Sequence, residues 1–128
     1  MRYARYITRK VVQDNPDTLY VFGDNMIGHG FGGQAKEMRG EPNVVGIPTK
    51  NYPGIQKQDY FSDGDFPAAT IKIALAFVRL FEHVRQGGQI VWPYDGIGTG
   101  MADLQNKSPK IWAFIEENRL QLEKLARK

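Results

Sequence analysis

Residues 19–35 read LYVFGDNMIGHGFGGQA, a short apolar run that leads directly into a cluster of glycines. The run at 19–22 is β-prone. The letters QAKEMR, which follow Gly33, are those of good helix formers. The segment therefore predicts a buried strand, a glycine loop and a helix that opens near Gly33.

A second segment repeats this arrangement later in the chain. The β-prone run at 89–92 is stopped by Pro93 and leads into a second glycine loop, YDGIGTGMADL, at 94–104. Ligands of open α/β sheets bind outside the carboxyl ends of strands, so both loops are predicted at the functional edge. Glycine there permits positive φ and lets main-chain N–H groups approach an anion. Two such loops favour an anion site over simple tight turns.

The remaining elements alternate between strands and helices. Strands are expected at 3–7 and at 43–47, where Pro48 stops the second one. Residues 49–65 form a long polar loop, and loops of that length are often functional lids. Ser108 and Pro109 cap a final helix. Alternating strands and helices predict one α/β domain over residues 1–128, with a mainly parallel sheet and helices on both faces.

A long helix is predicted over residues 68–86. Asp65 is its expected cap, and Pro67 lies in its first turn. Apolar residues recur at intervals of three and four, and so many are present that we expect the helix to be largely buried. These residues are Ile71, Ile73, Ala74, Leu75, Phe77, Val78, Leu80, Phe81 and Val84.

The composition limits the possible functions. With 128 residues, 41% of them hydrophobic, the chain suffices for one core. The absence of cysteine excludes a disulfide, a thiolate nucleophile and a Cys-ligated metal, and two separated histidines do not make a zinc site. No metal or cofactor is therefore expected. No segment resembles a signal peptide or a membrane span, so the expected location is the cytoplasm, or the host cytoplasm for a viral gene.

The net charge of +3 is concentrated at the two ends of the chain. The ends carry +7 together, which leaves −4 for residues 11–118. Nucleic acid binds through concentrated positive charge, so this distribution disfavours it as a partner unless the two ends meet in space. The charged residues at the ends are Arg2, Arg5, Arg9, Lys10, Arg119, Lys124, Arg127 and Lys128, against Glu123.

Two common nucleotide-binding motifs do not fit. The chain has no G-x-x-x-x-G-K-[ST], so it is not a P-loop NTPase. The letters HGFGGQA depart from G-x-G-x-x-G by one step, and no acidic residue follows at the expected distance in a clear second strand. A dinucleotide-dependent dehydrogenase is therefore disfavoured.

The order of motifs resembles that of a macrodomain, the α/β fold that binds ADP-ribose. The letters VFGDN precede MIGHGFGGQA, NVVGIPTK follows, and IVWPYDGIGTGMADL comes last. The resemblance spans roughly residues 19–105 and is closest to short, phage-associated macrodomain-like proteins. It also extends to the macrodomain branch that removes terminal ADP-ribose from proteins or DNA. It implies a single three-layer domain with a mainly parallel or mixed sheet, and an ADP-ribose-like nucleotide as the partner.

The resemblance also implies roles for individual residues. Asn25 would contact the distal ribose, and Lys50 and Asp103 match the lysine and aspartate of the ADP-ribose-removing branch, Asp103 lying one residue beyond the best match. The first loop would line the approach to ribose and diphosphate with Gly32, Gly33 and Ala35. The second would wrap the diphosphate with Gly96, Ile97, Gly98, Thr99, Gly100 and the adjoining Met101.

Several side chains near the loops are candidates for chemistry. Cleavage at a ribose C1″ passes through an oxocarbenium-like state that a carboxylate or a nucleophile assists. Lys50 would attack or neutralise phosphate, or else be a solvated surface lysine. Asp24 and Asp95 would act as a base or hold a ribose hydroxyl, or else be ordinary turn aspartates. His29 would be an acid, a base or a phosphate contact, or else a solvated loop histidine.

Adenine stacking has its own candidates, which are Phe31, Tyr52, Trp92 and Tyr94, although packing is the commoner role for each. The sequence therefore predicts binding of ADP-ribose or a related nucleotide. The favoured activity is hydrolysis of an ADP-ribosyl linkage or of ADP-ribose 1″-phosphate. A non-catalytic module that reads or sequesters such a ligand stays open, as does a nucleic-acid-associated protein that uses its basic termini.

Overall fold

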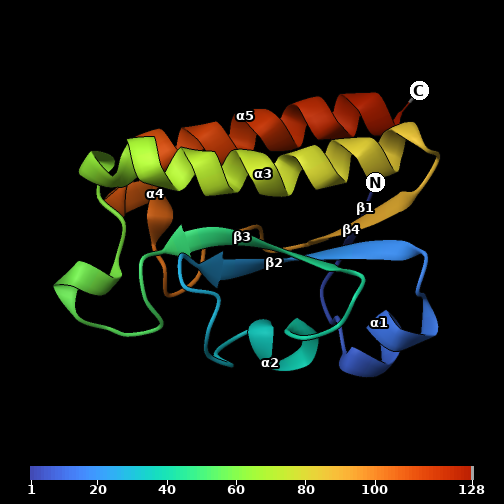
Figure 1. The fold of residues 1–128 in the computed structure, drawn as a ribbon, viewed down its shortest axis with the longest axis horizontal. Coiled ribbons are helices and arrows are strands. Elements are labelled where there is room, and N and C mark those ends of the chain that lie inside the picture. Colours follow the sequence, from blue (N-terminus) through green and yellow to red (C-terminus); the bar gives the residue numbers. More distant parts are fainter. Residues whose placement is uncertain (128) are drawn as a thin grey trace.

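The computed structural model describes residues 1–127 and contains one four-stranded sheet (Figure 1). The strand order is β1-β4-β2-β3, and every neighbouring pair is parallel, which confirms the α/β class predicted from the sequence. The strands are β1 (Arg2–Ala4), β2 (Thr18–Asn25), β3 (Val44–Lys50) and β4 (Gln89–Pro93).

Helices cover both faces of this sheet. Figure 1 shows the two long helices α3 and α5 side by side over one face, and the short helices α1 and α2 on the other. Each face has its own core of buried apolar side chains. The helices are α1 (Arg9–Asp14), α2 (Ala35–Met38), α3 (Phe66–Arg85), α4 (Leu104–Lys107) and α5 (Pro109–Ala126), with 3₁₀ turns at Lys57–Asp59 and Asp63–Asp65.

The strand boundaries differ from those expected. β2 extends through Asp24 to Asn25, since its last residues pair with β3. β3 runs through Pro48 because it is an edge strand, where a missing N–H costs no ladder hydrogen bond. β1 ends at Ala4, and the polar stretch after it forms α1, which Thr8 caps by accepting a hydrogen bond from the Val11 N–H.

Helix α5 begins as predicted, since the Ser108 hydroxyl accepts a hydrogen bond from the Ile111 N–H. Helix α3 begins at Phe66, with Pro67 in its first turn, but the prediction that Asp65 caps it is wrong, because the Asp65 carboxylate accepts a hydrogen bond from the Ser62 N–H and, among residues 1–127, none from the helix. Trp92 is fully buried and stacks on Phe77 at 6.1 Å between ring centroids. Trp92 therefore packs the core and is not available to stack on a ligand.

The expectation that α3 is largely buried is wrong for one side of the helix. The residues Ala69, Ile73, Phe77 and Leu80 are buried against the sheet and α5. Ile71, Leu75 and Val78 are exposed. The apolar residues lie on two opposite sides of the helix, and the domain covers only one of them.

The glycine loops lie where the winding of the sheet reverses. β2 and β4 are neighbours in the centre of the sheet. From β2 the chain goes to α2 on one face, and from β4 it goes to α4 and α5 on the other (Figure 1). Parallel strands that diverge in this way leave a crevice between their carboxyl ends. Among residues 1–127, no helix is long and apolar enough to cross a membrane.

Asn43 joins α1 to the sheet. Its side chain is buried, and its Nδ2 atom lies 2.9 Å from the carbonyl oxygens of both Val12 and Asn15 and 3.1 Å from that of Thr18. Its main-chain carbonyl accepts a hydrogen bond from the Tyr20 N–H at 3.0 Å. The side-chain amide of Asn43 therefore provides the donor for carbonyl oxygens at the end of α1 and in the turn into β2.

Replacing Asn43 with alanine should lower the free energy of unfolding by about 1–3 kcal/mol, because buried carbonyl oxygens lose their donor. Urea denaturation of N43A and the wild type measures this difference. Asn106→Ala is the matched control, because its exposed amide bonds only to Asp103 and should change stability by less than about 0.5 kcal/mol. Equal midpoints for N43A and N106A would contradict this role of Asn43.

Candidate functional site

A cavity of about 580 Å³ opens between the carboxyl ends of β2, β3 and β4. Both glycine loops contribute to its wall, as does the segment that follows β3. The residues around it are Gly23, Asp24, Asn25, His29, Gly30, Phe31, Gly32, Gly33, Gln34, Ala35, Arg39, Thr49, Lys50, Pro53, Gly54, Ile55, Asp95, Gly96, Gly98, Thr99, Gly100, Met101 and Ala102.

The structure brings together all but two of the candidate catalytic and loop residues. Ile97 points into the core and is buried beside Leu104 and other apolar residues. Asp103 lies at the start of α4 with φ of 45°, and its carboxylate accepts a hydrogen bond from the Asn106 amide. Neither residue lines the cavity. The others lie around one space, as the sequence predicted for residues of a shared pocket.

The four candidates for adenine stacking are placed differently. Only Phe31 lines the cavity. Trp92 is buried in the core, and Tyr52 and Tyr94 are exposed outside the cavity.

The bases of the two loops approach each other closely. A Cβ added to Gly23 would lie 4.0 Å from the main-chain nitrogen of Gly98. Gly98 has φ of +77°, and a Cβ there would come within 3.0 Å of the Leu104 Cβ. Glycine is therefore required at position 98 for both conformation and space.

Main-chain donors from both loops are available to a ligand. Within residues 1–127, the N–H groups of Gly32 and Gly33 in the first loop donate no hydrogen bond to the protein. The same holds for Thr99 and Gly100 in the second loop. All four residues are exposed, so their N–H groups are open to solvent or to a ligand in the cavity.

Arg39, which the sequence analysis missed, fixes the first loop. Its guanidinium donates to both Asp24 carboxylate oxygens, at 2.6 and 3.2 Å, and to the carbonyl oxygens of His29 at 3.2 Å and Gly30 at 2.6 Å. Gly46 makes room for this pair, since a Cβ there would lie 2.6 Å from Asp24 Oδ2. The Asp24 carboxylate is therefore committed to an ion pair.

Asn25 orders the first turn of the same loop. Its amide Nδ2 donates to the His29 carbonyl at 2.8 Å. Its Oδ1 accepts from the N–H groups of Ile27, at 3.2 Å, and His29, at 3.5 Å. One amide hydrogen is left over for a ligand. The structure thus shows Asn25 as an organiser of the loop, and the ribose contact that the resemblance implies depends on that remaining hydrogen.

Lys50 joins β3 to the loop that follows it. Its ammonium donates to the carbonyl of Gly54 and lies 4.4 Å from the centre of the Tyr60 ring. Asp59 is buried in this loop and accepts a hydrogen bond from the Gln56 N–H at 2.8 Å. The segment predicted as a possible lid is therefore an ordered wall.

Two ionisable side chains of the cavity are not engaged by the protein. Within the described part of the chain, the Asp95 carboxylate and the His29 imidazole take part in no hydrogen bond or ion pair, and both residues are exposed. Three apolar side chains, Phe31, Ile55 and Met101, are also exposed around the same cavity. In residues 1–127 no cluster of three His, Asp or Glu side chains is arranged to hold a metal.

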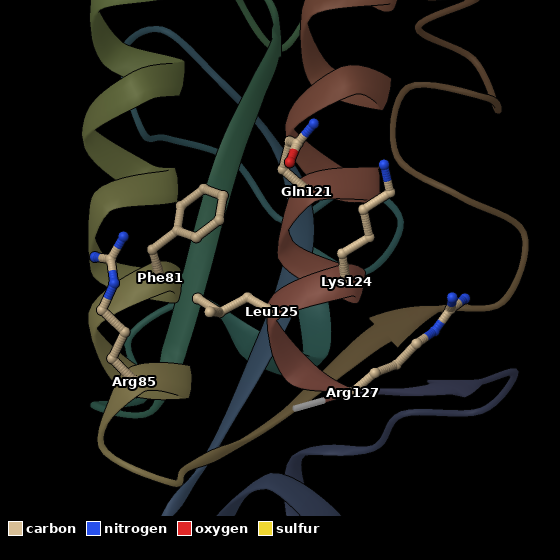
Figure 2. Close-up of a pocket in the computed structure, with 6 residues that line it drawn as sticks. All are labelled: Phe81, Arg85, Gln121, Lys124, Leu125 and Arg127. Atoms are coloured by element: carbon tan, nitrogen blue, oxygen red, sulfur yellow. The ribbon is translucent and has the colours of Figure 1, made fainter.

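A second hollow, of about 610 Å³, lies between α3 and α5 near the amino end of β4 (Figure 2). Phe81 and Leu125 point toward one another across it, whereas Arg85 and Arg127 extend away from it. Gln121 and Lys124 complete its lining. This hollow is at the opposite edge of the sheet from the glycine loops. None of the residues that line it belongs to a glycine-rich loop.

The two ends of the chain touch where Arg119 meets Tyr3, but Arg9 and Lys10 lie on α1, on the other face of the sheet from α5 (Figure 1), and acids neutralise much of the charge. Arg119 donates to the Tyr3 hydroxyl at 2.8 Å and pairs with Glu116 at 2.9 Å, and the hydrogen bond to Glu116 raises the pKa of Arg119. Further ion pairs are Arg9 with Glu41, Lys10 with Asp14, and Arg127 with Glu123. Lys128, which was counted among these charges, lies outside the described residues.

Comparison with known proteins gives one match. No curated protein and no solved structure is similar enough to match the chain. Residues 2–118 match a family described as a family of unknown function, DUF7831. The matched region includes both glycine loops and the whole of α3. Because it covers most of the sequence, the chain belongs to the DUF7831 family.

Proposed function

We propose that the cavity binds ADP-ribose or a closely related nucleotide. One observation carries this proposal: two glycine loops, one from each of the adjacent central strands β2 and β4, wall a single cavity at the carboxyl edge of a parallel sheet. Each loop brings main-chain N–H groups that the protein itself does not use. Donors of this kind bind phosphate without requiring a cationic side chain.

The shape and charge of the cavity support a ligand of this class. Its volume of about 580 Å³ falls in the range of about 300–1,000 Å³ that is typical of small-molecule sites. The Asp24 carboxylate is paired with Arg39, so it does not repel an anion. Lys50 adds a positive charge to the wall. The exposed side chains of Phe31 and Met101 suit the apolar face of a base.

The nucleic-acid alternative has less support. Four of its basic residues form ion pairs with Glu41, Asp14, Glu116 and Glu123, which reduces the field available to a phosphate backbone. None of the basic residues lines the cavity. The N–H groups that the glycine loops leave unused are open to a ligand in the cavity, and binding through the termini would not engage them.

Alanine at Gly32 or Gly100 should weaken nucleotide binding without harming the fold. Neither residue has positive φ, and a Cβ at either position meets no protein atom within 4 Å, although both line the cavity. The added methyl groups would instead occupy the space through which a phosphate reaches the loops. We expect each variant to bind ADP-ribose about tenfold more weakly, a loss of about 1.4 kcal/mol.

A thermal-shift titration with ADP-ribose, ADP and inorganic pyrophosphate measures this effect, since a ligand bound by the native state raises its melting temperature. Gly64→Ala is the matched control, because Gly64 has ordinary φ, meets only Ser62 Oγ at 3.5 Å and lies outside the cavity. G64A should bind like the wild type. If none of these ligands stabilises the wild type, or if G32A and G100A bind as G64A does, the proposal fails.

Hydrolysis of an ADP-ribosyl linkage is the second candidate, and the free Asp95 carboxylate favours it. Asp95 lines the cavity together with Lys50, and within residues 1–127 its carboxylate forms no ion pair or hydrogen bond. A carboxylate in this state suits the activation of water or the stabilisation of an oxocarbenium-like state. Asp24 is less suited to that role because Arg39 holds both of its oxygens.

Under this second candidate, Asp95→Asn should lower turnover of an ADP-ribosylated peptide or of ADP-ribose 1″-phosphate by about 10²-fold, the contribution of a positioned acid or base. Ligand-induced stabilisation should be retained. Asp103→Asn is the control, because that carboxylate lies outside the cavity and should leave turnover unchanged. A wild-type chain that binds ADP-ribose but releases no product would contradict hydrolysis and leave the binding proposal standing.

A further inference from the structure

An ion pair at the end of β2 holds the first glycine loop. The Arg39 guanidinium lies between the Asp24 carboxylate and two main-chain carbonyl oxygens of the loop. Both side chains are mostly covered, with 17% and 14% of their surfaces exposed. The pair thus connects a strand of the sheet to a loop that has positive φ at Gly28, Gly30 and Gly33.

The two carbonyl bonds of Arg39 also set the direction of main-chain N–H groups. In a planar trans peptide, the C=O and N–H groups point in opposite directions. The bond to the His29 carbonyl therefore fixes the direction of the Gly30 N–H, and the bond to the Gly30 carbonyl fixes that of the Phe31 N–H. In the described part of the chain neither N–H donates a hydrogen bond, and both residues line the cavity.

Helix α2 holds the end of the same loop. The Gly32 carbonyl accepts a hydrogen bond from the Ala35 N–H at 3.2 Å, which fixes the direction of the Gly33 N–H in the same way. Arg39 directly follows α2, so the residue that holds the middle of the loop is attached to the helix that holds its end. The directions of three available N–H groups therefore depend on Arg39 and α2 together.

We propose that Arg39 and Asp24 are positioning residues, which act on a bound nucleotide through the N–H groups of the first loop. This inference rests on the function proposed for the cavity. Of the five N–H donors of a guanidinium, Arg39 uses its Nε donor, one on Nη1 and both on Nη2 within the protein. One donor is left, whereas arginine typically binds phosphate through two parallel N–H bonds.

The sign of one substitution separates positioning from a direct effect of charge. Asp24→Asn removes a negative charge from the wall of a site for an anion. If the pair acted through charge, this change would strengthen binding, because Arg39 without its carboxylate partner would attract the phosphates. If the pair acts by positioning, the change weakens binding, because Arg39 loses its connection to β2 and the loop has to be ordered when the ligand binds.

We expect Asp24→Asn and Arg39→Lys each to bind ADP-ribose about tenfold more weakly than the wild type, the scale of ordering one residue of the backbone. Arg39→Lys keeps the charge but loses the planar fork that spans the carboxylate and the loop carbonyls, so an effect of charge alone predicts no change. The double variant should bind no more weakly than either single variant, since each breaks the same connection. Isothermal titration calorimetry with ADP-ribose measures all three.

Glu116→Gln and Arg119→Lys are the matched controls. This pair is also partly covered, its N and O atoms lie 2.9 Å apart, and neither residue lines the cavity. Both variants should bind ADP-ribose like the wild type. Thermal melts verify that every variant is folded, and Arg39→Lys, which leaves Asp24 in place, provides the same test if the Asp24→Asn chain does not fold.

Backbone amide relaxation, measured by NMR on the ligand-free chain, tests the ordering of the loop without any nucleotide. The order parameters of residues 30–33 should be about 0.85 in the wild type and should fall toward about 0.6 in Asp24→Asn and Arg39→Lys. The two control variants should keep the wild-type values.

Three outcomes would overturn the proposal. These are an Asp24→Asn variant that binds ADP-ribose as tightly as the wild type or more tightly, losses of affinity that add up in the double variant, and loop order parameters that are the same in the wild type and in both single variants. A wild type that binds no nucleotide would instead overturn the function proposed for the cavity, so the two failures are distinguishable.

Discussion

The parallel pairing of β2 with β4 on one side and with β3 on the other determines where every functional group can lie. Parallel strands end at the same edge, so the segments that follow them meet there. The two glycine loops reach one cavity because their strands are neighbours in the sheet, although about 70 residues separate them along the chain. A different strand order would place the same loops apart.

A glycine-rich loop has a large conformational entropy to lose, and the structure shows how this chain limits that cost. Arg39 connects two carbonyl oxygens of the first loop to Asp24, at the end of β2. The Asn25 side chain forms hydrogen bonds to the main chain of Ile27 and His29 in the first turn of this loop. The pair of Arg39 and Asp24 is partly covered from solvent, where an ion pair adds little net stability but fixes geometry. A loop that is ordered before ligand arrives does not lose that entropy on binding.

Much of the fold follows from local patterns in the sequence. The cap of α5, the run that forms β2 and the position of both loops all depend on neighbouring residues, which the sequence displays. The missed features depend on distant contacts. Arg39 and Asp24 lie 15 residues apart, and no local spacing marks the pair. Periodicity identified the apolar residues of α3, but it does not state which sides are covered. Plotting them around the helix would have separated two opposite stripes.

Helix α3 connects the two ends of the sheet. It begins after the loop that follows β3, near the cavity, and runs back to the start of β4 at the other edge of the sheet (Figure 1). One face of the helix is packed against the sheet and α5. The segment between β3 and α3, which contributes Pro53, Gly54 and Ile55 to the cavity wall, is therefore anchored at one end by β3 and at the other by the buried face of α3.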